Sequence, residues 1–293
     1  LIGLLLFGFT FYQNKQYQKQ AAYQAQLDSI ALVKQIQADS IAAVEAAQRM
    51  SSDTASVAQV AAAPVSIYKD SLLEAAHSAE AQIVTLANDK FEVAFTTKGA
   101  QPYSVKINEY SSYGGGELFI FKPEMSRYDI QVYAGETINT ADFNFVVAEK
   151  TDTSLAMRLP FAGGGYIEQR YSIAEGSYSV KNYLSFVGME NVIPKNVFSF
   201  DVDYFVTMPR MEKGYKSEVQ YSKLDYYFNG EKKPEAIAKG RSAQKRVDAR
   251  VSWFAFQQQF FSAIMRSPQE FASADFALNY FPEDDESHNL MTG

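Results

Sequence analysis

Carboxylates and two histidines are the residues of this chain that could do chemistry. Asp201 and Asp203 alternate along one run, so on a strand both point the same way and could hold a divalent ion or act as acid and base. The acidic stretch "EDDE" at 283–286 lacks the spaced ligands and the turn glycine of an EF-hand. We interpret both groups as solvated polar surface. His77 and His288 are too few for a multi-histidine metal site, so we expect no catalytic residue, no metal and no cofactor.

Composition argues against several classes of protein. The chain has 293 residues and a net charge of −7, from 27 basic and 34 acidic residues, which argues against a nucleic-acid partner. It contains no cysteine, which excludes disulfides, thiolate zinc sites and cysteine nucleophiles. The sequence motifs of phosphate-binding loops, dinucleotide-binding folds and serine hydrolases are absent. One basic cluster, "KGRSAQKR" at 239–246, is typical of a loop or a short exposed helix.

Two segments precede the part of the sequence that can form a core. Residues 1–12, "LIGLLLFGFTFY", carry no charge and predict part of an N-terminal transmembrane anchor, because twelve helical residues span about 18 Å of a bilayer core of roughly 30 Å. Residues 13–80 are rich in Ala and Gln and predict a helical or disordered spacer. "DSIALV" at 28–33 repeats as "DSIAAV" at 39–44, which leaves a weak coiled coil or helical stalk as the alternative to a low-complexity spacer.

Residues 81–293 carry most of the aromatic residues and repeatedly alternate apolar with polar positions, which is typical of half-buried strands. The clearest example is 196–206, where Phe198, Phe200, Val202, Tyr204 and Val206 would share one face. The other strand candidates are 91–110 (two strands broken at Gly99), 117–122, 142–147 and 178–186. Helices and strands do not alternate regularly, so we predict an all-β fold, a large antiparallel sandwich.

The stretch "VSWFAFQQQFFSAIM", residues 251–265, holds the only tryptophan of the chain. On a helical wheel its apolar residues cover about half the circumference, which fits a helix on the core or on a membrane surface. The alternative is a strand "VSWFAF", a turn "QQQF" and a second strand "FSAIMR" that ends before Pro268. We favour the second interpretation because the surrounding sequence predicts strands. The aromatic residues could line a binding groove or fill the core, and we favour core, because each buried aromatic side chain contributes to folding. The glutamines are then locally hydrogen-bonded turn residues.

The same stretch carries a family resemblance. "WFAFQQQFF", residues 253–261, resembles the motif W-[V/L/F]-A-x-x-Q-Q-[Y/F]-F in the periplasmic domain of the YidC/Oxa/Alb family of membrane protein insertases. Residues 88–110 are similar to the opening of that domain, with "KGA" between two strands, and 171–188 resemble its middle strand pair. The resemblance covers roughly residues 80–293. The residues that match the motif, interpreted as structural core, are Trp253, Phe256, Gln258, Gln259, Phe260 and Phe261.

The resemblance implies a β-supersandwich like that of galactose mutarotases. It implies a location in the inner (cytoplasmic) membrane, held by the N-terminal anchor in the lipid bilayer, with the β domain in the periplasm. The implied function is to assist newly made inner-membrane proteins in insertion and folding, with nascent membrane proteins and Sec translocon components as partners. This function turns over no chemical bond and uses no cofactor, so the chain is not expected to be an enzyme.

The sequence departs from the family pattern in one respect. The family's insertase core is a bundle of five membrane-spanning segments with an arginine in a polar groove, and no long apolar run follows residue 12. We therefore expect 81–293 to be the periplasmic docking domain, incomplete at its C-terminus, with the groove residues outside this sequence. Two rival functions remain open: a carbohydrate-binding or carbohydrate-active β-sandwich, and a cell-envelope scaffold protein.

Overall fold

The computed structural model describes residues 68–228 and 230–293, so the predictions for the anchor and for most of the spacer lie outside the described residues. Residues 68–80 of the predicted spacer are described and contain the helix α2 (Ser71–Ser78). The Asp70 side chain caps α2 by accepting from the amides of Leu72 and Leu73. Leu73 and Ala76 are buried in the same core as the strands, so this helix is packed onto the β domain.

Two four-stranded sheets come from the first half of the described residues, and every strand pairing in them is antiparallel. The first has the order β1-β2-β3-β4 and the second the order β10-β9-β8-β7. Their strands are β1 (Ile83–Ala87), β2 (Phe91–Thr96), β3 (Gln101–Ser111), β4 (Glu117–Phe121), β7 (Val146–Lys150), β8 (Ser154–Pro160), β9 (Tyr166–Ile173) and β10 (Val180–Val187).

A six-stranded and a four-stranded sheet complete the domain, again with antiparallel pairings throughout. The larger consists of β5 (Ser126–Tyr133), β6 (Thr137–Asn139), β11 (Asp201–Pro209), β14 (Ala243–Val247), β17 (Ala274–Tyr280) and β18 (Asn289–Thr292), in the order β14-β17-β18-β11-β5-β6. The smaller consists of β12 (Lys223–Phe228), β13 (Glu235–Lys239), β15 (Val251–Gln257) and β16 (Ser262–Phe271), in the order β13-β12-β15-β16. Two short elements accompany them, the 3₁₀ turn η1 (Thr140–Asp142) and the helix α3 (Tyr215–Tyr221).

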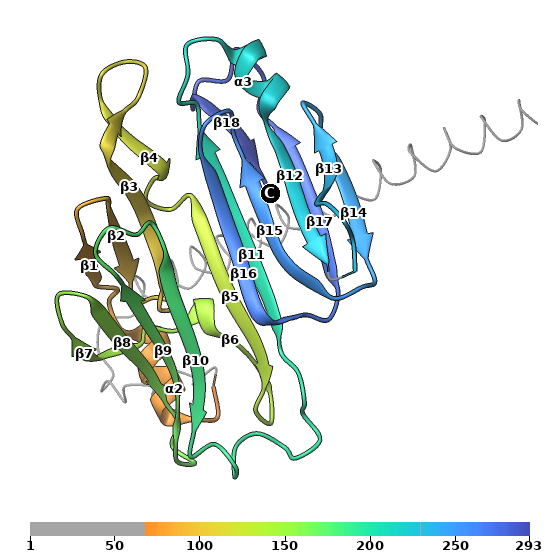
Figure 1. Ribbon diagram of the computed structural model, residues 1–293. Coiled ribbons are helices and arrows are strands. Elements are labelled where there is room, and N and C mark those ends of the chain that lie inside the picture. The colour runs from red at the N-terminus through yellow and green to blue at the C-terminus, as the bar shows by residue number, and fades with distance from the viewer. Residues whose placement is uncertain (1–67, 229) are drawn as a thin grey trace, which may run out of the picture. The chain divides into compact units, whose positions relative to one another are not determined.

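The strands lie in two groups, with β1–β4 and β7–β10 on one side and β11–β18 on the other (Figure 1). The buried core runs through both groups, from Phe91 and Phe95 in β2 to Leu224 in β12 and Leu278 in β17. The prediction of an antiparallel all-β fold is therefore confirmed. None of the helices in the described part of the chain is both long enough and apolar enough to cross a membrane.

Most predicted strands are present, and the differences have local causes. The turn at Gly99 is confirmed, since its φ of 76° is a conformation that glycine adopts without strain. The strand predicted at 196–206 begins only at Asp201, and the preceding Phe198 is 90% exposed. The prediction of a loop or helix at 239–246 was wrong, because these residues close the end of β13 and form most of β14. In the range 142–147, only Val146 and Val147 lie in a strand.

Candidate functional site: an aromatic groove

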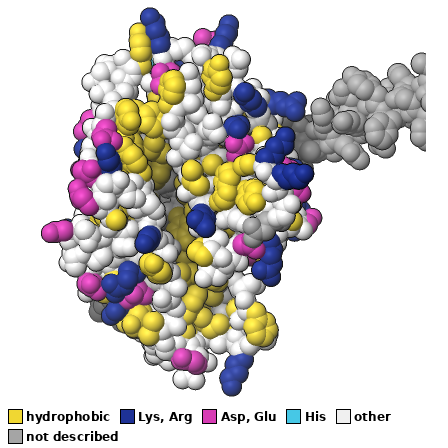
Figure 2. Space-filling view, viewed as in Figure 1, with side chains coloured by type: hydrophobic (Ala, Val, Ile, Leu, Met, Phe, Trp, Pro, Cys, Tyr) yellow, Lys and Arg dark blue, Asp and Glu magenta, His cyan; other side chains and the backbone are white. Residues whose placement is uncertain are grey.

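A long groove separates unpaired strand edges that come from distant parts of the sequence. The strands β10 and β16 are both at the edge of their sheets, and both line a groove with a volume of about 2810 Å³. Figure 2 shows this face of the molecule hollowed along its length, with hydrophobic side chains on both sides of the hollow. Exposed apolar surface of this extent is typical of a binding surface rather than of an ordinary monomer surface.

Aromatic side chains from two hairpins meet at the groove. Tyr110 near the end of β3 and Phe261 in the β15–β16 turn pack edge to face, with ring centroids 5.6 Å apart. Beside them Phe260 is 68% exposed and Ile264 is 65% exposed. We call Tyr110, Phe260, Phe261 and Ile264 the groove cluster. Such side chains offer apolar contact area to an apolar ligand, because their burial in a complex releases water from them.

The predicted turn within the motif is confirmed, since β15 ends at Gln257 and β16 begins at Ser262. The second strand does not end before Pro268 but continues to Phe271. The six motif residues do not share one environment. Phe256 is 3% exposed, whereas Phe260 points into the groove, and Trp253 is half-buried and stacks on Tyr227 with ring centroids 6.1 Å apart.

Gln258 holds the β15–β16 turn to a distant strand rather than bonding locally through its side chain. Its Nε2 donates to the carbonyl oxygen of Pro209 at 2.7 Å, and the side chain is 1% exposed. The backbone amide of Gln258 donates to the carbonyl of Phe261, which closes the turn. Gln259 is half-buried. The turn that carries Phe260 and Phe261 is thus positioned by β11.

The chain directly after β11 is held in place by the buried carboxyl group of Glu218. Glu218 in α3 is fully buried, and its Oε1 accepts from the amide of Met211 at 2.9 Å, while its Oε2 has no hydrogen-bond partner. Burial raises the pKa of Glu218, and the amides of Met211 and Glu212 only partly offset this effect. The carboxyl group is therefore easier to protonate in the folded protein than in the unfolded chain.

We expect the Glu218→Gln variant to lose a pH dependence that the parent protein has. A raised pKa in the folded state means that the stability contributed by this acid is present below its ordinary pKa and is lost as the pH rises through the raised value. The free energy of unfolding of the variant relative to the parent should therefore increase from acid towards neutral pH. Urea denaturation at a series of pH values measures this difference, and a difference independent of pH would contradict the assignment.

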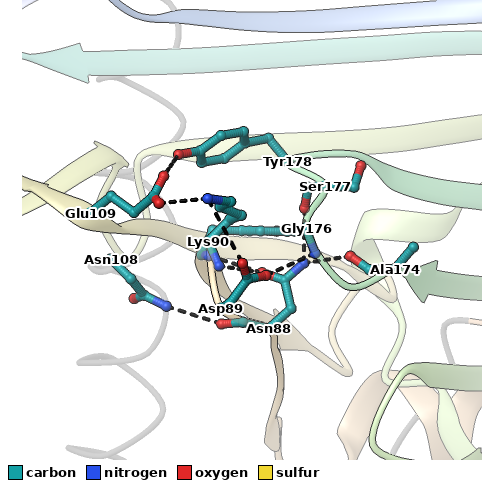
Figure 3. Close-up of polar contacts among 10 residues, drawn as sticks. Asn88, Asp89, Lys90, Asn108, Glu109, Ala174, Gly176, Ser177 and Tyr178 are labelled. Carbon is teal, nitrogen blue, oxygen red and sulfur yellow. Dashed lines mark hydrogen bonds and ion pairs between the residues drawn. The ribbon is translucent and has the colours of Figure 1, made fainter.

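A second polar cluster fastens the loop that leads into β10 (Figure 3). Asn88 Nδ2 donates to the carbonyl oxygens of Ala174 and Ser177 at 2.7 and 2.8 Å, and Asp89 accepts from the Gly176 amide at 2.8 Å. The neighbouring Lys90 pairs with Glu109 at 2.5 Å. These bonds join the turn before β2 to the β9–β10 loop. The cluster therefore sets where β10, one wall of the groove, begins.

Glu109 links Lys90 to Tyr178 in this cluster. It accepts from both Lys90 and the hydroxyl of Tyr178, and these hydrogen bonds lower the pKa of its carboxyl group. The same contact raises the pKa of the Lys90 ammonium. All of these polar groups are satisfied by one another, so the cluster is best explained as a structural clamp rather than as a reactive site.

The Asn88→Ala variant should be destabilised by about 1–3 kcal/mol, since Asn88 donates two hydrogen bonds to the loop and its Oδ1 accepts two more from the amides of Lys90 and Phe91. Asn108→Ala is the matched control, because the exposed Asn108 side chain makes one hydrogen bond, to the Asn88 carbonyl at 3.1 Å. Its effect should stay within about 0.5 kcal/mol. Urea denaturation of both variants checks the difference, and equal effects would contradict the clamp.

The other carboxylates and the two histidines do not gather into a single site. Asp201 and Asp203 lie on the exposed face of β11 and also line the groove. His77 packs against Tyr68 and Phe143, and His288 is exposed after the acidic loop. Among the residues that the structure describes, no group of three or more His, Asp or Glu side chains could hold a metal ion. An aromatic groove was the less favoured interpretation of residues 251–265, and the exposed Phe260 and Ile264 correct the preference for core at these two positions.

Comparison with known proteins finds sequence relatives that are described as insertases. No protein-family model matches it. A protein from Phocaeicola vulgatus described as "Membrane protein insertase YidC" is 27% identical over 275 residues, which cover 94% of this chain and 42% of that protein. Proteins of the same description from Porphyromonas gingivalis and Parabacteroides distasonis are 26% and 24% identical, covering 90% and 97% of this chain. The chain thus spans less than half the length of these relatives.

Among solved structures, a galactose mutarotase-like protein from Lactobacillus casei matches 72% of this chain and 86% of its own length, with 11% sequence identity and a TM-score of 0.44. A galactose mutarotase related enzyme from Lactobacillus acidophilus matches with 10% identity and a TM-score of 0.39. The sequence relatives extend over nine-tenths of the chain and carry one description throughout. The chain is a relative of the YidC membrane protein insertases.

Proposed function

We propose that this chain is part of a membrane protein insertase, and that its β domain is the docking module of that protein. The observation that carries the proposal is the alignment with YidC insertases over 94% of the chain. In this proposal the protein lies in the inner membrane, residues 1–12 belong to its membrane anchor, and the β domain is in the periplasm. Its substrates are newly made membrane proteins, its further partners are Sec translocon components, and it performs no enzymatic reaction.

The groove cluster supports a docking role in physical terms. A membrane protein segment that has not yet entered the bilayer exposes apolar side chains to water, and contact with other apolar surface lowers its free energy. Phe260 and Ile264 offer such surface, and both are mostly exposed. The anchoring of their hairpin through Gln258 keeps that surface in one place. Weak, non-directional contacts of this kind accept many different sequences, as an insertase requires.

In-cell photocrosslinking tests the proposal. A photoreactive amino acid at Phe260 or Ile264 should form crosslinks to newly made membrane proteins. The same amino acid at Tyr133 is the matched control, because Tyr133 is 50% exposed but does not line the groove. Crosslinks from all three positions alike, or from none, would contradict the docking role.

The same experiment separates the rival functions. Crosslinks to Sec components from the groove positions support a translocon-linked docking module, whereas crosslinks only to structural envelope proteins favour a scaffold. Specific binding of the purified domain to members of a sugar array favours the carbohydrate-binding function. Loss of insertion of newly made membrane proteins when the protein is depleted supports the insertase itself.

A further inference from the structure

The segment from Lys213 to Arg250 has the opposite charge to the chain as a whole. It contains ten basic and five acidic residues, a net charge of +5, whereas the whole chain has a net charge of −7. One of the five acids, Glu218, is fully buried. The segment forms α3, β12, β13 and β14. Figure 2 shows Lys and Arg side chains gathered at the right of the view, where Figure 1 places β13 and β14.

Most of these basic side chains are not neutralised by a neighbouring acid. Three of the ten form ion pairs, with acids of β12, β13 and β17 and of the turn after β14. The other seven are all exposed, and none of them forms an ion pair with an acid in the part of the chain that the structure describes. Unpaired charges of one sign on one face attract a partner of the opposite sign.

Two of the unpaired cations line one pocket. Lys216 in α3 and Lys239 at the end of β13 both line a pocket with a volume of about 530 Å³. The amide of Gly240 donates to the carbonyl oxygen of Ser222 at 3.1 Å, which fastens the end of β13 to the end of α3. Arg241 follows directly and is exposed. Three positive charges therefore lie around a pocket with room for a phosphate group.

Tyrosine rings lie against cations of the same face. The Nζ of Lys239 lies 5.5 Å from the ring centroid of Tyr221, which is 45% exposed. Exposed tyrosine beside lysine is typical of residues at the level of lipid headgroups, where the ring meets the apolar boundary and the ammonium meets phosphate. A nucleic acid fits less well, because the net negative charge of the chain would repel its phosphates.

We propose that the basic face formed by α3, β13 and β14 binds the headgroups of anionic phospholipids and holds the β domain against the surface of a bilayer. Lys216, Lys239 and Arg241 lie closest to the lipid phosphates. The same surface repels the acidic remainder of the chain, so the charge distribution selects one orientation of the domain. This proposal rests on the membrane location in the proposed function, but not on docking of newly made proteins in the groove.

Quenching of a single fluorophore by labelled lipid headgroups tests the proposal on the whole chain. Because the chain contains no cysteine, Ser217→Cys places one label in α3, beside Lys216. Vesicles of phosphatidylcholine and phosphatidylglycerol with a headgroup quencher should quench this label, and vesicles of phosphatidylcholine alone should not. High salt should remove the quenching. A label introduced by Thr153→Cys, exposed in the β7–β8 turn, is the control position and should be quenched less.

Removal of two charges separates the basic face from the net charge. In the Lys216→Gln/Lys239→Gln variant, binding of the face to anionic vesicles should fall roughly 25-fold, because each basic residue near such a surface contributes about fivefold. Lys122→Gln/Lys150→Gln is the matched control, since both lysines are exposed and lie beside β4 and β7, in the other group of strands. The control should lower binding by less than about twofold.

Each outcome decides for or against the lipid surface. Loss of quenching in the first double variant and not in the control supports it. Equal losses in the two double variants, equal quenching of the two label positions, or equal quenching without phosphatidylglycerol overturn it.

Soluble anions form the last arm of the experiment. Inorganic phosphate and sodium polyglutamate are each added at constant ionic strength. If either removes the quenching at a charge concentration below that of the vesicles, the face takes a free phosphate or an acidic polypeptide, and the proposal of a lipid surface is wrong. The assay contains no newly made protein, so its failure is distinct from a failure of the groove positions to form crosslinks.

Discussion

Replacement of Phe256 by alanine should lower the free energy of unfolding of this protein by about 3–5 kcal/mol, the usual cost of removing a buried phenylalanine. Phe256 is 3% exposed and lies among the rings of Tyr204 and Phe254, each with its centroid 6.2 Å away. The variant loses these contacts and leaves a cavity between β15 and β11. Urea denaturation followed by the fluorescence of Trp253, the single tryptophan, measures the loss.

Phe260→Ala is the matched control, because it removes the same side chain four residues away in the same motif. Phe260 is 68% exposed, so its truncation should change the free energy of unfolding by no more than about 0.5 kcal/mol. In the proposed function Phe260→Ala nevertheless weakens docking, whereas Phe256→Ala acts through folding. Similar losses of stability in both variants would contradict the division of the motif into a buried and an exposed half.

Alternating apolar and polar residues predict a strand correctly where the segment also has a neighbouring strand to pair with. In β11 the exposed Asp201 and Asp203 alternate with the half-buried Val202 and Tyr204, as the period of two requires. The same alternation continues back to Phe198, which lies outside the strand and is 90% exposed. Periodicity reports which side of a strand a residue would face, but the extent of the strand depends on a partner. The partner β5 pairs with β11 only from Asp201 onward.

The groove and its anchor could not be predicted from the sequence because both depend on long-range pairing. The turn at "QQQF" follows from local sequence, but the partner of Gln258 is Pro209, 49 residues earlier. The groove exists because β10 and β16 are edge strands, and the position of a strand within its sheet leaves no signal in its own residues. For the same reason the buried Phe256 and the exposed Phe260 cannot be told apart from their own sequence positions.

The Gly165→Ala variant should be destabilised by about 2–5 kcal/mol, because two separate costs apply at this position. The φ of Gly165 is 79°, and an alanine there costs about 1–2 kcal/mol of backbone strain. In addition, a Cβ atom would lie 2.4 Å from the carbonyl oxygens of both Val187 and Gly188, and overpacking of this kind adds about 1–3 kcal/mol. These oxygens cannot easily retreat, since Val187 is paired with Tyr166 in the β9–β10 ladder.

Gly164→Ala separates the two costs. Gly164 also has a positive φ, of 98°, but a Cβ atom there would meet nothing within 4 Å. Its variant should lose only the strain, about 1–2 kcal/mol. Because the clash at Gly165 pushes on the end of β10, hydrogen exchange of the β10 amides should accelerate in Gly165→Ala and not in Gly164→Ala. Equal losses in the two variants would mean that β10 yields freely at this end, and that this wall of the groove is held by the Asn88 clamp alone.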